Sequence, residues 1–294
     1  MKFSINGKLQ LIFAIAGGLV TAAAAGAQTL HYKTIQVPGA QNTYVFGVND
    51  SGTLLIEYTD AAGTSRCATD SGGTFTEIRD PKTVGTGPGK GTSCSGINKA
   101  GQVVGSYSTA TSVNGFLYTS GTFQDIIAPG ATNGTLAYGL NDHGQIVGEY
   151  ASPTADHGFV YNGSSYVTLD VPGGNVTGAL SINNAGLIVG LSVDAGGATH
   201  GWFLRGGTYS TLNAPGATGT YAVSINNTGQ ILLEGFNSAG AVNGYVLSKG
   251  AFQQFDVAGA FSTYAFCIDD NGVISGAFAL TNGGAQSGYV GRVF

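Results

Sequence analysis

A short motif that recurs through the whole chain constrains the fold more than any other feature. In each copy an apolar residue is followed by Asn or Asp, and Gly comes four positions after the apolar residue. The apolar anchors are Val48, Ile97, Leu140, Ile182, Ile225 and Ile268. They are spaced by 49, 43, 42, 43 and 43 residues, so there are six copies, and the first spacing contains an insertion. A fixed period of this length is the mark of a repeat architecture.

Each repeat contains four short apolar or alternating runs separated by turn residues. In the third repeat these runs are Leu136–Asn141, Gln145–Tyr150, Gly158–Tyr161 and Tyr166–Val171. Closely spaced strands of this kind indicate an all-β fold, and four strands in about 43 residues indicate the blade of a β-propeller. The 50 glycines and the low charged content of 9% suit many tight turns. We therefore predict a six-bladed β-propeller with four-stranded blades.

The first strand of each repeat alternates small and large side chains. The residue three before the anchor is small, and the residue two before it is mostly large: Phe46, Ser95, Tyr138, Leu180, Val223 and Phe266. Successive residues of a strand face opposite sides. We therefore expect the large face of one sheet to pack against the small face of the next.

The turn after each first strand has Asn or Asp at its start and Gly at its end. Asn and Asp bond nearby backbone, and Gly supplies the left-handed residue that returns the chain. A calcium loop is the alternative, because Asp269, Asp270 and Asn271 offer clustered oxygens. Lys99 occupies the same turn in the second repeat and no copy has the downstream Glu of a calcium loop. We expect no metal and no cofactor.

The two ends of the chain complement each other. The last repeat supplies only three strands, Tyr264–Ile268, Val273–Phe278 and Gly288–Val293. The segment His31–Gly39 matches the fourth strand of the third repeat, Tyr166–Gly173. We predict that this N-terminal strand completes the last blade and closes the ring, because an unpaired sheet edge would otherwise remain.

Residues 1–27 have the plan of a secretory signal peptide: a basic start, an apolar run and a small-residue end at Ala25-Gly26-Ala27. A retained membrane anchor is the alternative. No other apolar run approaches the ~20 residues needed to span a bilayer. We therefore expect residues 28–294 to form one domain that is secreted, extracellular or periplasmic, and monomeric. The net charge of −5 without a basic cluster argues against nucleic acid as a partner.

Three cysteines are present, so one pair can bridge in an oxidising compartment. Cys67 and Cys94 both fall toward the face that carries the longest insertion, Pro81–Ser93, and a bridge between them would restrain it. Two separate buried thiols are the alternative. Cys267 occupies a position where other repeats have Gly or Ser, which suggests a small buried thiol.

The third strand carries a further motif: His157-Gly158-Phe159 and His200-Gly201-Trp202, with Asn or Ser in place of His in other repeats. Together with the Ile-Asn-x-x-Gly-x-Ile-Val-Gly strand pair and the Pro-Gly-Ala linker, it resembles the bacterial extracellular repeats named after a His-Ala-Phe triplet (HAF). The resemblance covers essentially the whole chain after residue 27. Here Gly takes the middle position, and the first repeat has Arg66-Cys67-Ala68 instead. The resemblance implies secretion and a repeat fold, and it implies no reaction.

The loops between second and third strands share one face with the linkers between blades. The candidate binding residues on this face are Asp60, Arg66, Asp156, His157, Asp194 and His200. Acids around a His could perform acid–base chemistry on a sugar. Alternatively, each His bonds the backbone of a neighbouring blade. The recurrence at a repeat position favours this structural role.

Glu57, Glu149 and Glu234 share one position in the second strands of alternate repeats. They could ring a channel and hold a cation, or they could be solvated or bonded to adjacent backbone. We find no catalytic residue set. The sequence therefore favours a non-catalytic propeller that binds extracellular carbohydrate or protein. A glycan hydrolase or lyase with Asp and His at the channel mouth and a structural envelope or matrix protein are the alternatives.

Overall fold

The computed structural model describes residues 28–293, and these contain strands, turns and loops without any helix. The predicted signal peptide, residues 1–27, lies outside the described residues. Within the described part of the chain there is no helix that could cross a membrane.

The strands follow one another in the order that the repeats predict, four to a repeat. Repeats 1 and 2 contain β2 (Asn42–Val48), β3 (Leu54–Thr59), β4 (Ser65–Ser71), β5 (Thr74–Ile78), β6 (Thr92–Ile97), β7 (Val103–Ser108), β8 (Val113–Thr119) and β9 (Thr122–Ile126). Repeats 3 and 4 contain β10 (Thr135–Leu140), β11 (Ile146–Ala151), β12 (Asp156–Tyr161), β13 (Tyr166–Leu169), β14 (Gly174–Ile182), β15 (Ile188–Asp194), β16 (Thr199–Arg205) and β17 (Thr208–Leu212). Repeats 5 and 6 contain β18 (Gly219–Ile225), β19 (Ile231–Phe236), β20 (Val242–Ser248), β21 (Ala251–Asp256), β22 (Ser262–Ile268), β23 (Ile274–Ala279) and β24 (Ser287–Val293), with β1 (Gln28–Ile35) beside β24.

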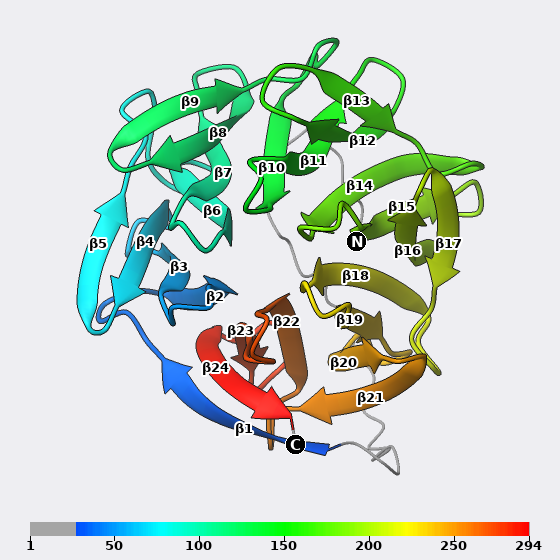
Figure 1. Cartoon of the computed structure of the whole chain (residues 1–294). Coiled ribbons are helices and arrows are strands. Elements are labelled where there is room, and N and C mark those ends of the chain that lie inside the picture. Colours follow the sequence, from blue (N-terminus) through cyan, green and yellow to red (C-terminus); the bar gives the residue numbers. More distant parts are fainter. Residues whose placement is uncertain (1–27, 294) are drawn as a thin grey trace.

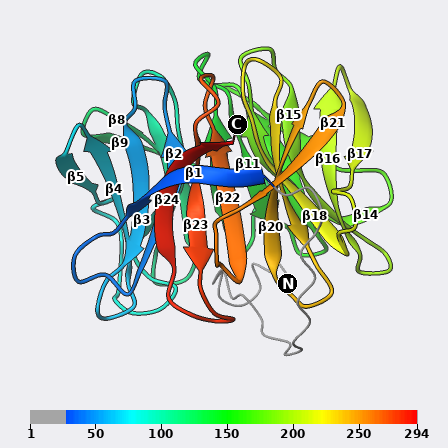
Figure 2. The ribbon, with the colours of Figure 1, turned by 90° about the horizontal axis from the view of Figure 1, so that it is seen from below.

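The strands form a β-propeller, with the sheets arranged around a central axis and standing upright in the side view (Figures 1 and 2). The predicted all-β propeller is confirmed. The hydrogen-bonded sheets, however, number four and not six: two have four strands and two have eight. Each larger sheet joins the strands of two repeats by a short parallel contact, Asp156 with Val176 in one and Gln28–Thr29 with Phe255–Asp256 in the other. The prediction of six separate sheets is wrong in this respect, since sequence spacing says nothing about contacts between the rims of neighbouring repeats.

The expected regular alternation of small and large side chains along the first strands also needs a correction. In each first strand the pairing register shifts at the residue two positions before the anchor. In the third repeat, for example, the shift falls at Tyr138, between Ala137 and Gly139. A β-bulge leaves that residue unpaired and increases the local twist. The bulged Phe46 and Phe266, from the first and last repeats, stack with ring centroids 4.5 Å apart. In the first and last repeats the large side chains at this position therefore contact each other.

The small residue directly before each anchor lets neighbouring repeats approach closely. A Cβ added to Gly139 would lie 2.7 Å from the carbonyl oxygen of Leu180. In later repeats the position is polar, and the Ser181 hydroxyl accepts a hydrogen bond from the Ile225 amide at 3.2 Å. Cys267 belongs to this series and remains unpaired, with its thiol directed to the carbonyl of Val48.

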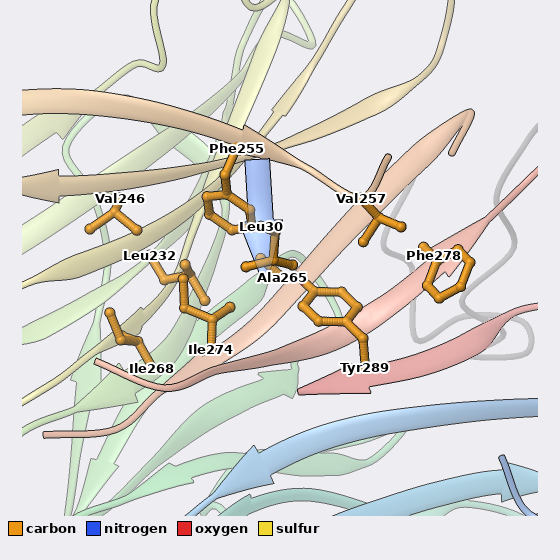
Figure 3. Close-up of a cluster of buried hydrophobic side chains, with 10 residues drawn as sticks. All are labelled: Leu30, Leu232, Val246, Phe255, Val257, Ala265, Ile268, Ile274, Phe278 and Tyr289. Carbon is orange, nitrogen blue, oxygen red and sulfur yellow. The ribbon is translucent and has the colours of Figure 1, made fainter. Parts of the chain in front are cut away.

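Strand β1 closes the ring as predicted. It pairs antiparallel with β24 from Leu30–Val293 to Ile35–Gly288, so the N-terminal segment completes the last repeat. Most of β1 is exposed, but Leu30 is only 2% exposed. Its side chain packs into a cluster that includes Phe255 and Tyr289 (Figure 3). The burial of Leu30, the edge contacts of Tyr32 with Phe278 and Tyr289, and the ladder join β1 to the last repeat.

The structure joins Cys67 of β4 and Cys94 of β6 by a disulfide, with a Cα–Cα distance of 5.4 Å. The two residues belong to neighbouring repeats, and both are buried. The bond encloses the long insertion of the first repeat, which is the arrangement that the bridged alternative predicts.

Candidate functional site

Polar side chains gather at the ends of the third and fourth strands, on the face formed by the loops and linkers. Four repeats place three such groups together. One comes from the end of the second strand or the loop after it, one is the second residue of the third strand, and one lies in the fourth strand or directly after it. We call these sets the loop-face clusters. They are Asp60–Arg66–Glu77, Ser152–His157–Asp170, Asp194–His200–Asn213 and Asn237–Asn243–Asp256.

In repeat 3 the ring of His157 bridges two partners. Its Nδ1 lies 2.7 Å from Asp170 Oδ1 and its Nε2 lies 3.2 Å from the hydroxyl of Ser152. The ring also stacks on Tyr150, with centroids 5.2 Å apart. The side chain of Asp170 is 56% exposed, so its carboxylate keeps room for a further donor.

In repeat 4 His200 occupies the equivalent position. Its two ring nitrogens lie 3.2 Å from Asn213 Oδ1 and from Asp194 Oδ2. Asp194 also accepts two backbone amides of its own loop, and these bonds, led by that of Ala198, lower its pKa. Both predicted histidines therefore bond side chains of their own repeat. The expectation that they bond the backbone of a neighbouring blade is wrong, because the loop after the second strand folds back over the third strand.

In repeat 1 the corresponding position is a guanidinium. Arg66 lies 2.9 Å from Asp60 and 3.4 Å from Glu77. Asp60 also accepts the amides of Ala62 and Thr64, and the pKa of its carboxyl is lowered chiefly by the bond from Thr64. Of the predicted residues, the structure brings together Asp60 with Arg66 and Asp194 with His200.

Asp156 is the predicted residue that does not join its neighbour. Adjacent residues of a strand face opposite sides, so Asp156 points away from His157. It lies near Glu149 and Tyr138, and burial raises its pKa. The pair Asp156 and His157 therefore does not form an acid–base set.

Of the three glutamates of the second strands, Glu149 and Glu234 are buried and Glu57 is half-buried. Burial raises the pKa of Glu57 to about 7 and the pKa of Glu149 and Glu234 to about 8. Glu57 and Glu234 bond the backbone amides of Cys94 and Ala265 in the next repeat. Bonding to adjacent backbone, one of the predicted alternatives, thus holds for two of the three.

Glu149 differs because neither of its carboxylate oxygens has a hydrogen-bond partner among the described residues. Its carboxylate occupies the space that Gly178 leaves: a Cβ on that glycine would lie 2.8 Å from Glu149 Oε2. The buried hydroxyl of Tyr138, which lies nearby, also has no partner in the described chain.

A cavity of about 110 Å³ lies on the axis at the opposite face, where the turns after the first strands meet. The Asn that follows each of the first five anchors is buried, and its Oδ1 accepts amides of its own turn. Its Nδ2 reaches the carbonyl of the same residue in the next repeat, from Asn49 to Asn98 and onward to Asp269, at 2.9–3.3 Å. This Asn ring is a structural belt round the axis.

The next residue of each turn forms a second belt. In each turn from Lys99 to Asp270, the backbone amide of this residue donates to the side chain of the equivalent residue in the next repeat. Asn184, for example, donates to Asn227 Oδ1 at 2.7 Å. These side chains are bonded to one another and so are not directed at a ligand. Among the described residues no group of three or more His, Cys, Asp or Glu is placed to hold a metal ion.

The sequence pattern did not identify three kinds of cluster residue: those from the fourth strands, the loop residue of repeat 3, and all members of the cluster in repeat 5. The missed residues are Glu77, Ser152, Asp170, Asn213, Asn237, Asn243 and Asp256. The signal was available for part of this set: the residue that follows Ile78, Leu169, Leu212 and Phe255, near the end of the fourth strands, is polar (Arg79, Asp170, Asn213 and Asp256). Aligning the fourth strands as well as the third would have found it.

No protein-family model matches the sequence, and no curated protein matches it. Solved propellers do match its structure. Aleuria aurantia lectin, described as a six-bladed β-propeller with a novel fucose recognition mode, is 11% identical with a TM-score of 0.51, over 88% of this chain and 93% of that one. AofleA from Arthrobotrys oligospora is 14% identical with a TM-score of 0.55, over 90% of each chain. TolB from Acinetobacter baumannii is 12% identical with a TM-score of 0.53, over 87% of this chain and 66% of that one. At these identities the likeness shows the fold alone.

Proposed function

We propose that this protein is a secreted, monomeric, non-catalytic propeller that binds carbohydrate through its loop-face clusters. The observation that carries the proposal is the recurrence of a three-part polar set at equivalent positions in repeats 3, 4 and 5, with the related set Asp60–Arg66–Glu77 in repeat 1. Carboxylate, amide, imidazole and guanidinium groups are suited to the many hydroxyls of a sugar, since they donate and accept hydrogen bonds in fixed directions. The recurrence would allow several weak sites to act together on one glycan.

We also infer that each eight-stranded sheet is two blades, which makes six in all. The support is that the parallel contacts joining repeats involve one or two residue pairs, whereas each repeat has its own antiparallel ladder. The likeness to propeller lectins supports a binding role, and the resemblance to HAF repeats together with the signal-peptide pattern supports secretion.

The arrangement of the ionisable groups favours binding over hydrolysis. Each histidine has one acid partner in its own repeat, Asp170 for His157 and Asp194 for His200. The third group of each set is Ser152 or Asn213, so neither set is an Asp–His–Asp cluster. Glycoside hydrolysis canonically uses two carboxyl groups that face one bond, and neither histidine cluster supplies such a pair. In repeat 1 the carboxylates of Asp60 and Glu77 both bond Arg66.

A glycan array probed with residues 28–294 tests the proposal. We expect binding to a defined group of glycans, and we expect the double variant His157→Ala, Asp170→Ala to lose about tenfold in affinity, as removal of charged hydrogen bonds does. His143→Ala is the matched control, because His143 is exposed in a turn on the opposite face. The absence of glycan binding, or equal binding by the double variant, would overturn the proposal, and release of reducing sugar would overturn its non-catalytic part.

A further inference from the structure

The first repeat carries a pair of positive charges where other repeats carry a hydrogen-bonded pair. The second residue of the third strand bonds the residue at the end of the fourth strand or directly after it in repeats 3, 4 and 5, at 2.7–3.2 Å. The ladder pairs Cys67 with Ile78 in the same way that it pairs Gly158 with Leu169. The equivalent residues in repeat 1 are therefore Arg66 and Arg79. Two guanidiniums can only donate hydrogen bonds, so they require an acceptor between or beside them.

A small pocket lies at this point, between the ends of β4 and β5 and the insertion that follows. Its volume of about 20 Å³ gives room for a water molecule or for the terminal atoms of an anionic group. Both arginines line the pocket. The other polar side chains that line it include Thr64, Thr83, Thr86 and Glu77.

The local charges leave a positive surplus. Arg66 is paired with Asp60 and Glu77. Arg79 and Lys90 take part in none of the ion pairs of the described chain. The side chain of Lys90 lies against Gly85, one of the residues that line the pocket. A Cβ added to that glycine would lie 3.4 Å from Lys90 Cδ.

The nearby acids do not cancel this surplus. Asp125 is held by Lys82 Nζ at 2.7 Å. Asp80 accepts the backbone amide of Lys82 and does not line the pocket. Asp80 is buried, and burial raises its pKa, which disfavours its charged form.

The pocket wall is fixed in place by bonds within the insertion. The hydroxyls of Thr83 and Thr92 lie 2.8 Å apart, and the amide of Gly87 donates to Thr64 Oγ1 at 2.8 Å. The disulfide between Cys67 of β4 and Cys94 of β6 joins strands on either side of β5 and the insertion. A wall fixed in advance loses little entropy on binding.

We propose that the first repeat binds the carboxylate of an acidic sugar, with Arg79 as the principal contact and Arg66 and the threonine hydroxyls beside it. Arginine suits this role because its planar fork matches a carboxylate bidentately. This inference rests on the proposed carbohydrate-binding function and assigns the substrate class for one of its sites: glycans that contain uronic or other carboxylated sugars.

Calorimetric titration with a short oligogalacturonate and with its fully methyl-esterified form tests the inference, because esterification removes the negative charge of every carboxylate and keeps the sugar chain. We expect the acid to bind at least about tenfold more tightly than the ester, with affinity that falls as salt is added. Arg79→Gln should abolish this preference. Arg205→Gln, at an exposed position that ends β16, should leave it unchanged.

The possible outcomes separate the two proposals. If neutral glycans bind on the array and the acid binds no better than its ester, the acidic-sugar inference fails and carbohydrate binding stands. If the preference for the acid survives in Arg79→Gln, the site assignment fails. If no glycan binds, neutral or acidic, both proposals fail. Equal melting temperatures of the variants and the wild type establish that a lost preference is not a loss of fold.

Discussion

The side-chain amide of Asn226 donates to the backbone carbonyl of Asp269 across 2.9 Å, and it is the last of five such bonds round the axis. The sixth would run from residue 269 to the carbonyl of Asn49. Asp269 is a carboxylate and has no amide hydrogen to donate. The Asn ring therefore has a gap between the last repeat and the first.

Asp269→Asn should close this gap. A buried hydrogen bond contributes about 1 kcal/mol, so we expect the melting temperature to rise by about 2–4 °C. Asn141→Asp is the matched control, since it opens a second gap and should lower the melting temperature by a similar amount. Thermal unfolding of the three proteins measures both effects, and an Asp269→Asn variant no more stable than wild type contradicts the prediction.

The buried glutamates should make stability depend on pH. Their pKa values in the folded protein, about 7 for Glu57 and about 8 for Glu149 and Glu234, are raised above the ordinary value of 4.5. Between these values the folded protein binds protons that the unfolded chain has released. The stabilisation is therefore complete below about pH 4.5 and is lost as the pH rises to about 8. We expect the free energy of unfolding to fall by a few kcal/mol over this range.

Glu149→Gln should remove part of this pH dependence, because an uncharged amide replaces the carboxylate that has no described partner. Urea unfolding at pH 5 and pH 8 measures the effect. Glu77→Gln is the control, since its side chain is 45% exposed and should not alter the slope. A wild-type stability that is constant between pH 5 and pH 8 would show that the glutamates do not hold protons in the folded state.

The closure of the ring by β1 should depend on one apolar side chain. Leu30→Ala removes a fully buried leucine from the cluster with Phe255 and Tyr289, which typically costs about 2–5 kcal/mol. Lys33→Ala alters an exposed residue of the same strand and should cost little. Chemical denaturation measures both, and similar small losses would mean that β1 contributes little to closure.

Removing the disulfide should destabilise the first two repeats. Cys67→Ser with Cys94→Ser frees a segment of 27 residues and should lower the free energy of unfolding by about 2–4 kcal/mol. Treatment with a reductant should have the same effect on wild type and none on the double variant. Cys267→Ser is the control, because that cysteine is unpaired. If the reductant leaves the melting temperature of the wild type unchanged, the bond does not stabilise the protein.

The repeat pattern was sufficient to predict the strands, their order and the pairing of β1 with β24. This was possible because strand periodicity and turn chemistry are local properties of about ten residues, and because each repeat confirms the others. Cys67 and Cys94 could be singled out for a similar reason, since both flank one insertion. The glycine before the anchor could be read from the sequence, but the reason why glycine is needed there could not. The carbonyl of Leu180 in the next repeat approaches Gly139 too closely for a Cβ.

The contents of each repeat, namely its strands, its turns and the residues that recur at each position, can therefore be read from the amino-acid order. Which groups meet is a property of the folded molecule, as for His157 with Asp170, Arg66 with Glu77 and Glu149 with the space over Gly178. These partners lie on different strands or repeats, and a bulge or a folded loop moves a side chain by several ångströms without changing the periodicity. Contacts between strands depend on register and twist, which one chain's pattern does not encode residue by residue.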